Sequence, residues 1–214
     1  MKLFALALSA FALFSAPVFA QDSNGQMMEN INEGAAPVNA EGVKFLSDFA
    51  DCAASAQADK ADQVLSEFPS SVASDKNLFN IAMRSKNCVP GGEKLRFSVR
   101  YLRGPIAEYL LKRDYDLADW KLKKKRVLIY AAPPNADLAE QNADVRSAVV
   151  FHEIGSCVVN ADPSGVASLF QSARGSASEK AAFAGLSETL AGCIPPSVEL
   201  RLSKFQLRGN LAEA

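Results

Sequence analysis

The stretch that decides the fold is Leu-Arg-Gly-Pro-Ile-Ala-Glu at residues 102–108, because it recurs as Leu-Arg-Gly-Asn-Leu-Ala-Glu at residues 207–213. The two copies lie 105 residues apart, and residues 44–109 align with residues 149–214 at that same offset without a gap. Of the 66 aligned positions 13 are identical, and most of these identities fall in the last third of the alignment. Identities clustered in this way indicate an internal duplication.

The first twenty residues have the features of an export signal. A positive start at Lys2 is followed by an apolar run at residues 3–14 and by small residues that end at Ala20, where we expect cleavage. The run is shorter than the roughly 20 residues needed to cross a bilayer. No longer apolar run follows, so we expect no transmembrane segment in the mature chain. The short leader is typical of bacteria and indicates a periplasmic protein or, as the second choice, a secreted one.

The four cysteines follow the same offset. Cys52 aligns with Cys157 and Cys88 with Cys193, so each copy holds two cysteines 36 residues apart. Four cysteines in an exported chain indicate two disulfides. Three pairings are possible, and the duplication favours Cys52–Cys88 and Cys157–Cys193, one bridge in each copy. On the chain-entropy model, closing a loop of this length stabilises the fold by about 4 kcal/mol.

The remaining chain divides into four parts. Residues 21–38 are polar, acidic and aperiodic, and we expect a flexible lead-in. Apolar residues at helical spacing predict a first helical unit at residues 39–115 and a second helical unit at residues 143–214. Residues 116–142 form a basic connector between them, and a connector of this length is often functional or mobile. We therefore predict an all-α fold of two tandem disulfide-stapled units, packed about a pseudo-two-fold axis.

Several helix starts can be placed from the sequence. Asp162, followed by proline, is suited to cap a helix, and Ser176 with a glutamate three residues later predicts a capping box. We expect the helix that begins there to run to Cys193. Ser98 and Ser203 are expected N-caps of the last helix of each unit. Brief alternation at residues 93–98 and 198–203, with or without 127–130, allows a small β element.

The repeated motif has two interpretations. In the first, Arg103 with Glu108 and Arg208 with Glu213 are recognition groups that hold a ligand carboxylate or phosphate. In the second, which we favour, each arginine satisfies carbonyls or a carboxylate at the contact between the units. The glycine after each arginine then lets another helix approach closely.

The basic connector is the feature that most directly suggests a partner. Its candidate binding residues are one aromatic side chain and five cations: Trp120, Lys121, Lys123, Lys124, Lys125 and Arg126. Such a stretch is suited to an anionic membrane surface, to lipopolysaccharide phosphates or to an acidic protein. It is equally compatible with a solvated loop that charge keeps soluble. Without Lys2 the chain has 22 basic and 24 acidic residues, and nucleic acid is not an expected partner of an exported chain with this balance.

Signatures of catalysis are scarce. The sequence has no nucleophile elbow, phosphate loop or dinucleotide fingerprint. His152 is the one histidine, and with Glu153 beside it can form neither a three-ligand metal site nor a triad. A small hydrolase with paired carboxylates, for which Glu93 and Glu108 are candidates, stays an alternative. We expect a non-enzymatic binding protein of the cell envelope, without metal or cofactor, that binds an unknown protein or an anionic envelope component.

The duplicated pattern Cys-Val/Ile-Pro, then Leu-Arg-x-Ser, then Leu-Arg-Gly-x-x-Ala-Glu resembles that of exported proteins of Gram-negative bacteria. The resemblance covers both helical units and leaves out the lead-in and the connector. It implies a fold and an export location, and it implies no activity.

Overall fold

A computed structural model describes residues 40–89, 97–122, 143–195 and 202–214. All of them belong to one compact unit, Asn32–Ala214. The predicted fold class is confirmed, because the chain is mainly helical and each helical unit has its own disulfide. The segments expected to form a small sheet lie largely outside the described residues.

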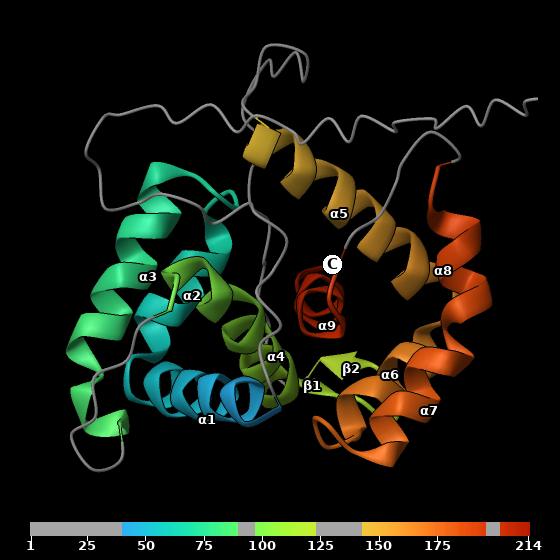
Figure 1. Cartoon of the computed structure of the whole chain (residues 1–214), viewed down its shortest axis with the longest axis horizontal. Helices are drawn as coiled ribbons and strands as arrows, with labels where there is room; N and C mark the ends of the chain where they lie inside the picture. The colour runs from blue at the N-terminus through green and yellow to red at the C-terminus, as the bar shows by residue number, and fades with distance from the viewer. Residues whose placement is uncertain (1–39, 90–96, 123–142, 196–201) are drawn as a thin grey trace, which may run out of the picture. The chain divides into compact units, whose positions relative to one another are not determined.

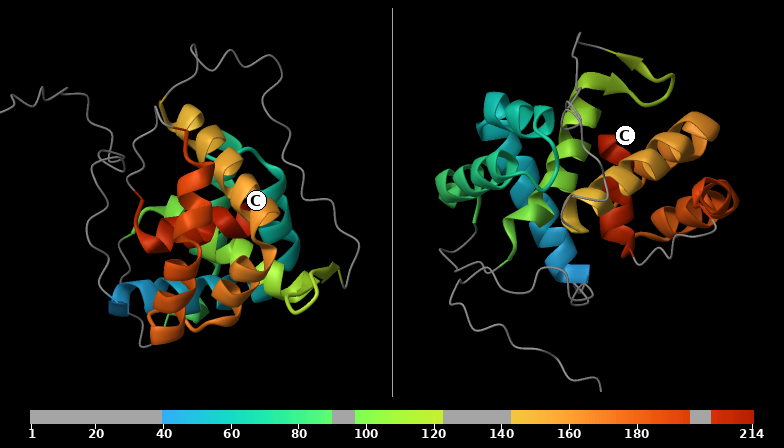
Figure 2. Two further views of the ribbon diagram at one scale, coloured as in Figure 1. Left: turned by 90° about the vertical axis from the view of Figure 1, so that its right-hand side faces the viewer. Right: turned by 90° about the horizontal axis from the view of Figure 1, so that it is seen from above.

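In its described residues, 40–89 and 97–115, the first helical unit has four α-helices and two short 3-10 helices (Figure 1). In chain order these are α1 (Ala40–Ala56), α2 (Ala58–Ser66), α3 (Val72–Arg84), η1 (Lys86–Cys88), η3 (Val99–Leu102) and α4 (Arg103–Asp114). A small antiparallel hairpin continues from the end of α4 (Figure 2). Its two strands, β1 (Tyr115–Asp116) and β2 (Lys121–Leu122), have two residues each.

The second helical unit repeats this order up to its last helix. Its elements are α5 (Ala143–Ala161), α6 (Pro163–Gln171), α7 (Ala177–Gly185), α8 (Ser187–Cys193) and α9 (Lys204–Glu213). At the offset of 105 residues, α5 corresponds to α1, α6 to α2, α7 to the first part of α3, and α9 to α4.

The helix starts confirm the capping residues read from the sequence. The side chain of Asp162 accepts the N–H of Gly165 at 2.8 Å, and proline follows it at the first helical position. Ser203 caps α9 in a full capping box with Gln206. Ser98 also acts as an N-cap, although the helix it opens is η3, which leads into α4.

Two expectations on the third helix of the second unit are corrected. The helix does not run without a break to Cys193, because it ends at Gly185 and restarts as α8. Glycine is a poor helix former, and the next residue, Leu186, turns into the core at the break. The capping box is only half formed. Ser176 accepts the N–H of Glu179, but the Glu179 carboxylate accepts the N–H of Gly175.

Both disulfides form as the duplication predicts. Cys52–Cys88 joins α1 to η1, with the two Cα atoms 5.7 Å apart, and Cys157–Cys193 joins α5 to the end of α8, with Cα atoms 5.8 Å apart. Each bridge therefore fixes the first helix of its unit to the segment that follows the third. This holds the apolar faces of the helices of each unit around a common interior.

The two units meet at α4 and α9. Both helices lie in the middle of the described residues, where α4 also packs on α1 and α9 on α5 (Figure 1). A Cβ atom added to Gly104 would lie 2.7 Å from the Cα of Gly209, and one added to Gly209 would lie 2.8 Å from the Cα of Gly104. The glycine backbones of the two helices are thus in direct contact, as the sequence predicts for the glycine after each arginine.

Candidate functional site

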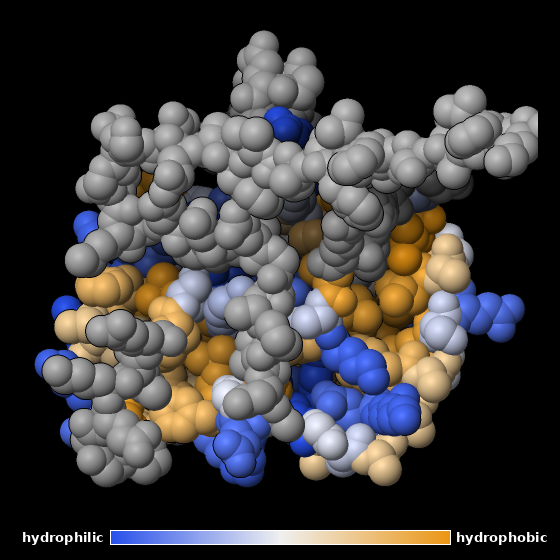
Figure 3. Space-filling model, viewed as in Figure 1, coloured by the Kyte–Doolittle hydropathy of each residue, from blue (hydrophilic) through white to orange (hydrophobic). Residues whose placement is uncertain are grey.

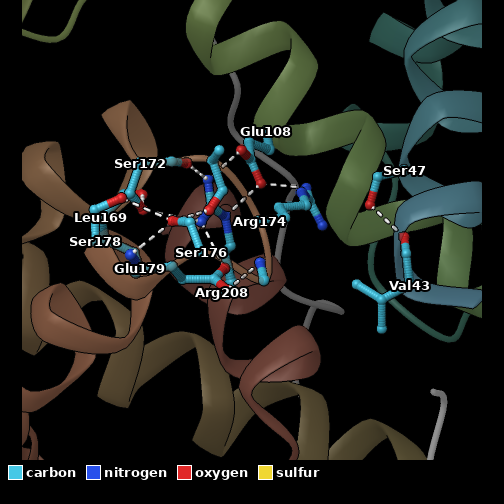
Figure 4. Close-up of polar contacts among 12 residues, drawn as sticks. Val43, Ser47, Glu108, Leu169, Ser172, Arg174, Ser176, Ser178, Glu179 and Arg208 are labelled. Carbon is cyan, nitrogen blue, oxygen red and sulfur yellow. Dashed lines mark hydrogen bonds and ion pairs between the residues drawn. The ribbon is translucent and has the colours of Figure 1, made fainter. Parts of the chain in front are cut away.

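Arg208 is buried at the contact between the units, with only 1% of its surface exposed. Its Nε and Nη2 atoms donate to the two carboxylate oxygens of Glu108 at 2.8 and 2.7 Å (Figure 4). Nη2 also donates to the carbonyl of Ser172 at 3.0 Å, and Nη1 donates to the Ser172 hydroxyl at 3.4 Å and to Glu179 at 2.7 Å. A guanidinium has five N–H donors, so each of them has an acceptor within the chain.

Arg103 lies at the equivalent position of the first unit and is also buried. Its Nε donates to Glu213 at 2.7 Å. Its other nitrogens donate to the carbonyls of Val64 and Glu67 at 2.7 and 2.9 Å and to the hydroxyl of Ser74 at 2.8 Å. Here the arginine of the first unit is satisfied by the carboxylate at the end of the second.

Two acceptors of each arginine lie at equivalent positions of the two units. At the offset of 105, Glu67 corresponds to Ser172, whose carbonyls both accept from an arginine, and Ser74 corresponds to Glu179, whose side chains both accept. In each of the ion pairs Arg103–Glu213 and Arg208–Glu108, the arginine comes from one unit and the glutamate from the other. This reciprocal pattern is that of a contact with two-fold symmetry. These contacts are those of the structural interpretation of the motif, and they direct Arg103, Arg208 and Glu108 into the interior.

The Glu108 side has more positive charge than its counterpart. Arg174 and Lys112 also contact the Glu108 carboxylate, which is 2% exposed. Burial alone would raise the pKa of Glu108, but the hydrogen bonds from Arg208 and the charges of Arg174, Arg208 and Lys112 together lower it. The carboxylate is therefore held ionised inside the fold.

His152 lies on α5, in partly buried surroundings. Burial lowers its pKa, and the charges of Glu213 and Glu153 only partly oppose that effect. Within residues 40–89, 97–122, 143–195 and 202–214, no three His, Cys, Asp or Glu side chains are grouped so that they could hold a metal ion.

Trp120 and Lys121 lie in the hairpin that begins the basic connector. The indole N–H of Trp120 donates to the carbonyl of Pro163 at 2.8 Å, which ties the hairpin to the first turn of α6. Lys121 is exposed. The other four cations of the expected binding stretch, residues 123–126, lie outside the described residues. Their role in binding stays a prediction.

A surface that the sequence reasoning did not single out lies on α3. Val72, Phe79 and Met83 are 87%, 52% and 49% exposed. At 100° per residue they lie within about 40° of one another, opposite the buried Leu78 and Ile81. We call these three side chains the α3 apolar stripe. The helix is thus apolar on two opposite faces, a pattern that a search for one inward stripe passes over.

Three cationic side chains lie close to the α3 apolar stripe in the sequence. Lys76 lies on the same face of α3, and Arg84 and Lys86 are exposed at and just beyond its C-terminal end. Asp75, the acidic residue of the helix, lies about 60° from the middle of the stripe. Its carboxylate and that of Asp144 share the Arg100 guanidinium at 2.8 and 2.7 Å. On the left of Figure 3, over the position of α3 in Figure 1, hydrophobic residues in orange tones lie at the surface beside hydrophilic residues in blue.

The second unit has no counterpart of this stripe. Val72, Phe79 and Met83 correspond at the offset of 105 to three exposed residues of another character, Ala177, Ala184 and Glu188. The three cations are likewise replaced by Ala181, Thr189 and Ala191. The second unit is helical over these positions, as α7 and α8, without these side chains, so a helical segment at this place does not require the stripe.

Comparison with known proteins gives no relative from which a role could be transferred. No family model matches the chain, no curated protein matches it, and no solved structure matches its fold. No helix of the described ranges is both long and apolar enough to cross a membrane. The function of this chain is therefore inferred from the side chains described above.

Proposed function

We propose that this chain is an exported interaction protein of the cell envelope whose binding surface is the α3 apolar stripe with its cations. Two disulfides indicate an oxidising environment outside the cytoplasm. The proposal adds that residues 1–20 are a cleaved signal peptide, that the mature protein resides in the periplasm, and that the two units arose by duplication. A relationship to exported proteins of Gram-negative bacteria is part of the same proposal.

One observation supports the binding role above the others. Large apolar side chains that are exposed along one helix face favour association with a partner. Here the second unit acts as an internal reference, because the same positions hold alanine and glutamate there. The exposed side chains of α3 therefore serve something other than folding.

The buried groups of the unit contact support a non-enzymatic role. The arginines and Glu108 are engaged with one another and with backbone carbonyls, so they supply rigidity to the contact. A rigid core that carries one adhesive helix face is suited to docking.

Photo-crosslinking in living cells tests this function. A photoreactive amino acid is placed at Phe79 or Met83, and the matched control carries it at Ala184, the exposed equivalent of Phe79 in the second unit. We expect discrete adducts from the α3 positions and few from the control. Equal labelling from all three positions, or none from α3, would contradict the proposed surface.

A further inference from the structure

We infer that the partner of the α3 surface is an anionic lipid layer, into which the apolar stripe inserts while the neighbouring cations contact lipid phosphates. This inference rests on the proposed function, since it names the partner of the same surface. Three features of α3 lead to it: the shape of the surface, the sign of its charge and the order of its side chains.

The shape favours a lipid layer over a protein partner. The stripe is the outward ridge of one helix whose opposite face, with Leu78 and Ile81, is buried in the unit. A convex ridge needs a matching groove in a protein, whereas a fluid lipid layer closes around it. Val72 and Met83 are 11 residues apart, so the ridge is about 16 Å long and can lie flat in the interface.

The charge selects an anionic layer. Lys76, Arg84 and Lys86 are exposed. The nearby carboxylates of Asp75 and Asp144 share the one Arg100 guanidinium, at 2.8 and 2.7 Å, so that cluster has one net negative charge against three cations. A second copy of the chain is disfavoured as partner, because two such stripes would bring like charges together. Each cation near an anionic membrane surface contributes on the order of 1 kcal/mol, which corresponds to about fivefold in affinity.

The side-chain order is that of an interfacial helix. Apolar residues precede and follow Lys76 along the ridge, and the cations Arg84 and Lys86 lie at its end. Long basic side chains can bury their methylene stems and extend the charged group to the phosphates. Phe79 and Met83 can then enter the acyl boundary without displacing those charges.

Vesicle sedimentation tests the inference. The full chain, purified after export, is mixed with vesicles of phosphatidylcholine alone or with phosphatidylglycerol at one third. We expect binding only to the anionic vesicles, weakened by salt. The variant Val72→Ala, Phe79→Ala, Met83→Glu, which gives α3 the residues of the second unit, should lose binding at least tenfold.

A charge variant and a matched control complete the design. Changing Lys76, Arg84 and Lys86 to Gln should weaken binding by about tenfold to a hundredfold, from the contribution of each cation. The control carries three Lys→Gln changes at exposed sites away from α3, at Lys44, Lys180 and Lys204. It removes the same net charge and should bind anionic vesicles nearly as well as the wild-type protein.

The outcomes separate this inference from the proposed function. If the vesicles do not bind but Phe79 crosslinks to one protein in cells, the lipid partner is wrong and the binding surface stands. If neither occurs, both are wrong. Binding that the control loses as much as the α3 charge variant, or that only residues 121–126 support, would also overturn the role of the stripe.

Discussion

Two glycines determine how closely the helical units approach. With no side chain at Gly104 or Gly209, the backbones of α4 and α9 touch, and the arginine before each glycine reaches across to a glutamate of the other unit. A single added methyl group would lie against backbone rather than against a side chain that could move. At the scale of residues, the unit contact thus depends on an absence of atoms as much as on the ion pairs.

Gly209→Ala is predicted to destabilise the protein. Its methyl group would lie 2.8 Å from the Cα of Gly104, so the helices must separate, and overpacking of this kind costs about 1–3 kcal/mol. Gly192→Ala on α8 is the control, because its methyl group meets no atom within 4 Å. This variant should raise the free energy of unfolding by up to about 1 kcal/mol, since alanine is a better helix former than glycine. Urea denaturation measures both, and equal midpoints for the two variants would contradict the close contact.

Ionisation of Glu108 is expected to make the free energy of unfolding depend on pH in the acid range. Its folded pKa is lowered from the ordinary value of 4.5, so its ionised form stabilises the fold at pH values above that unfolded pKa. That contribution is lost as the pH falls through the lower folded pKa. Glu108→Gln should lose about 3–5 kcal/mol at pH 7, because Arg208 keeps a buried charge without its partner.

The acid dependence should weaken in the same variant. The free energy of unfolding, measured from pH 7 to pH 3, is expected to decline less steeply for Glu108→Gln than for the wild-type protein. Glu188→Gln, at an exposed position of α8, is the control and should keep the wild-type slope. If Glu108→Gln also keeps that slope, the buried carboxylate is not the group that titrates.

At the scale of elements, each unit combines a long first helix, α1 or α5, with shorter helices, and one bridge joins the first helix to the segment after the third. Helices α2 and α6 have only nine residues each, a length at which an isolated helix is marginal in water. Their stability comes from packing and from the disulfide that joins the first helix to the segment after the third. Helix α3 is apolar on two faces, of which one packs in this core and the other is exposed.

Removal of either disulfide is predicted to cost a similar amount. Both bridges close loops of 36 residues, so the Cys52→Ala, Cys88→Ala variant and the Cys157→Ala, Cys193→Ala variant should each lose about 4 kcal/mol. Denaturant unfolding without reductant measures the loss. A bridge whose removal leaves the midpoint unchanged would not be constraining the unfolded chain.

The α3 apolar stripe is predicted to be dispensable for stability. The variant Val72→Ala, Phe79→Ala, Met83→Glu should stay within about 0.5 kcal/mol per substitution of the wild-type protein, because exposed positions contribute little. Thermal unfolding by circular dichroism checks this. A large loss would mean that these side chains pack on something in the folded chain, and it would remove the argument for a docking surface.

What the sequence could predict follows from where the information lies. The pairing of Cys52 with Cys88 follows from the repeat, because equal offsets favour equal environments. The repeat also predicts that a helix packs closely on each motif glycine, but not that Gly104 and Gly209 contact each other. The acceptors of Arg208 could not be predicted, since Ser172 and Glu179 come from other helices at separations that only the fold determines. The contact of Trp120 with α6 could not be predicted either, because Trp120 lies outside the aligned residues of the repeat.

At the scale of the whole molecule, the units are expected to unfold together. Trp120 is the single tryptophan, and its indole bonds the carbonyl of Pro163 in the second unit. Its fluorescence therefore reports on the junction, while far-ultraviolet circular dichroism reports on all helices. We expect the two transitions to coincide in urea, as in a two-state unfolding. A fluorescence change well before the loss of helix would mean that the units separate first.

The reciprocal ion pairs have a consequence for how such a molecule assembles. A contact in which each half supplies the arginine for the other half's glutamate is the contact of a symmetric homodimer. Two separate chains would form it only above a threshold concentration. Carrying both halves on one polypeptide makes the encounter intramolecular, so the melting temperature should not change on dilution. The surfaces outside the contact are then free to differ between the units, as Phe79 and its equivalent Ala184 do.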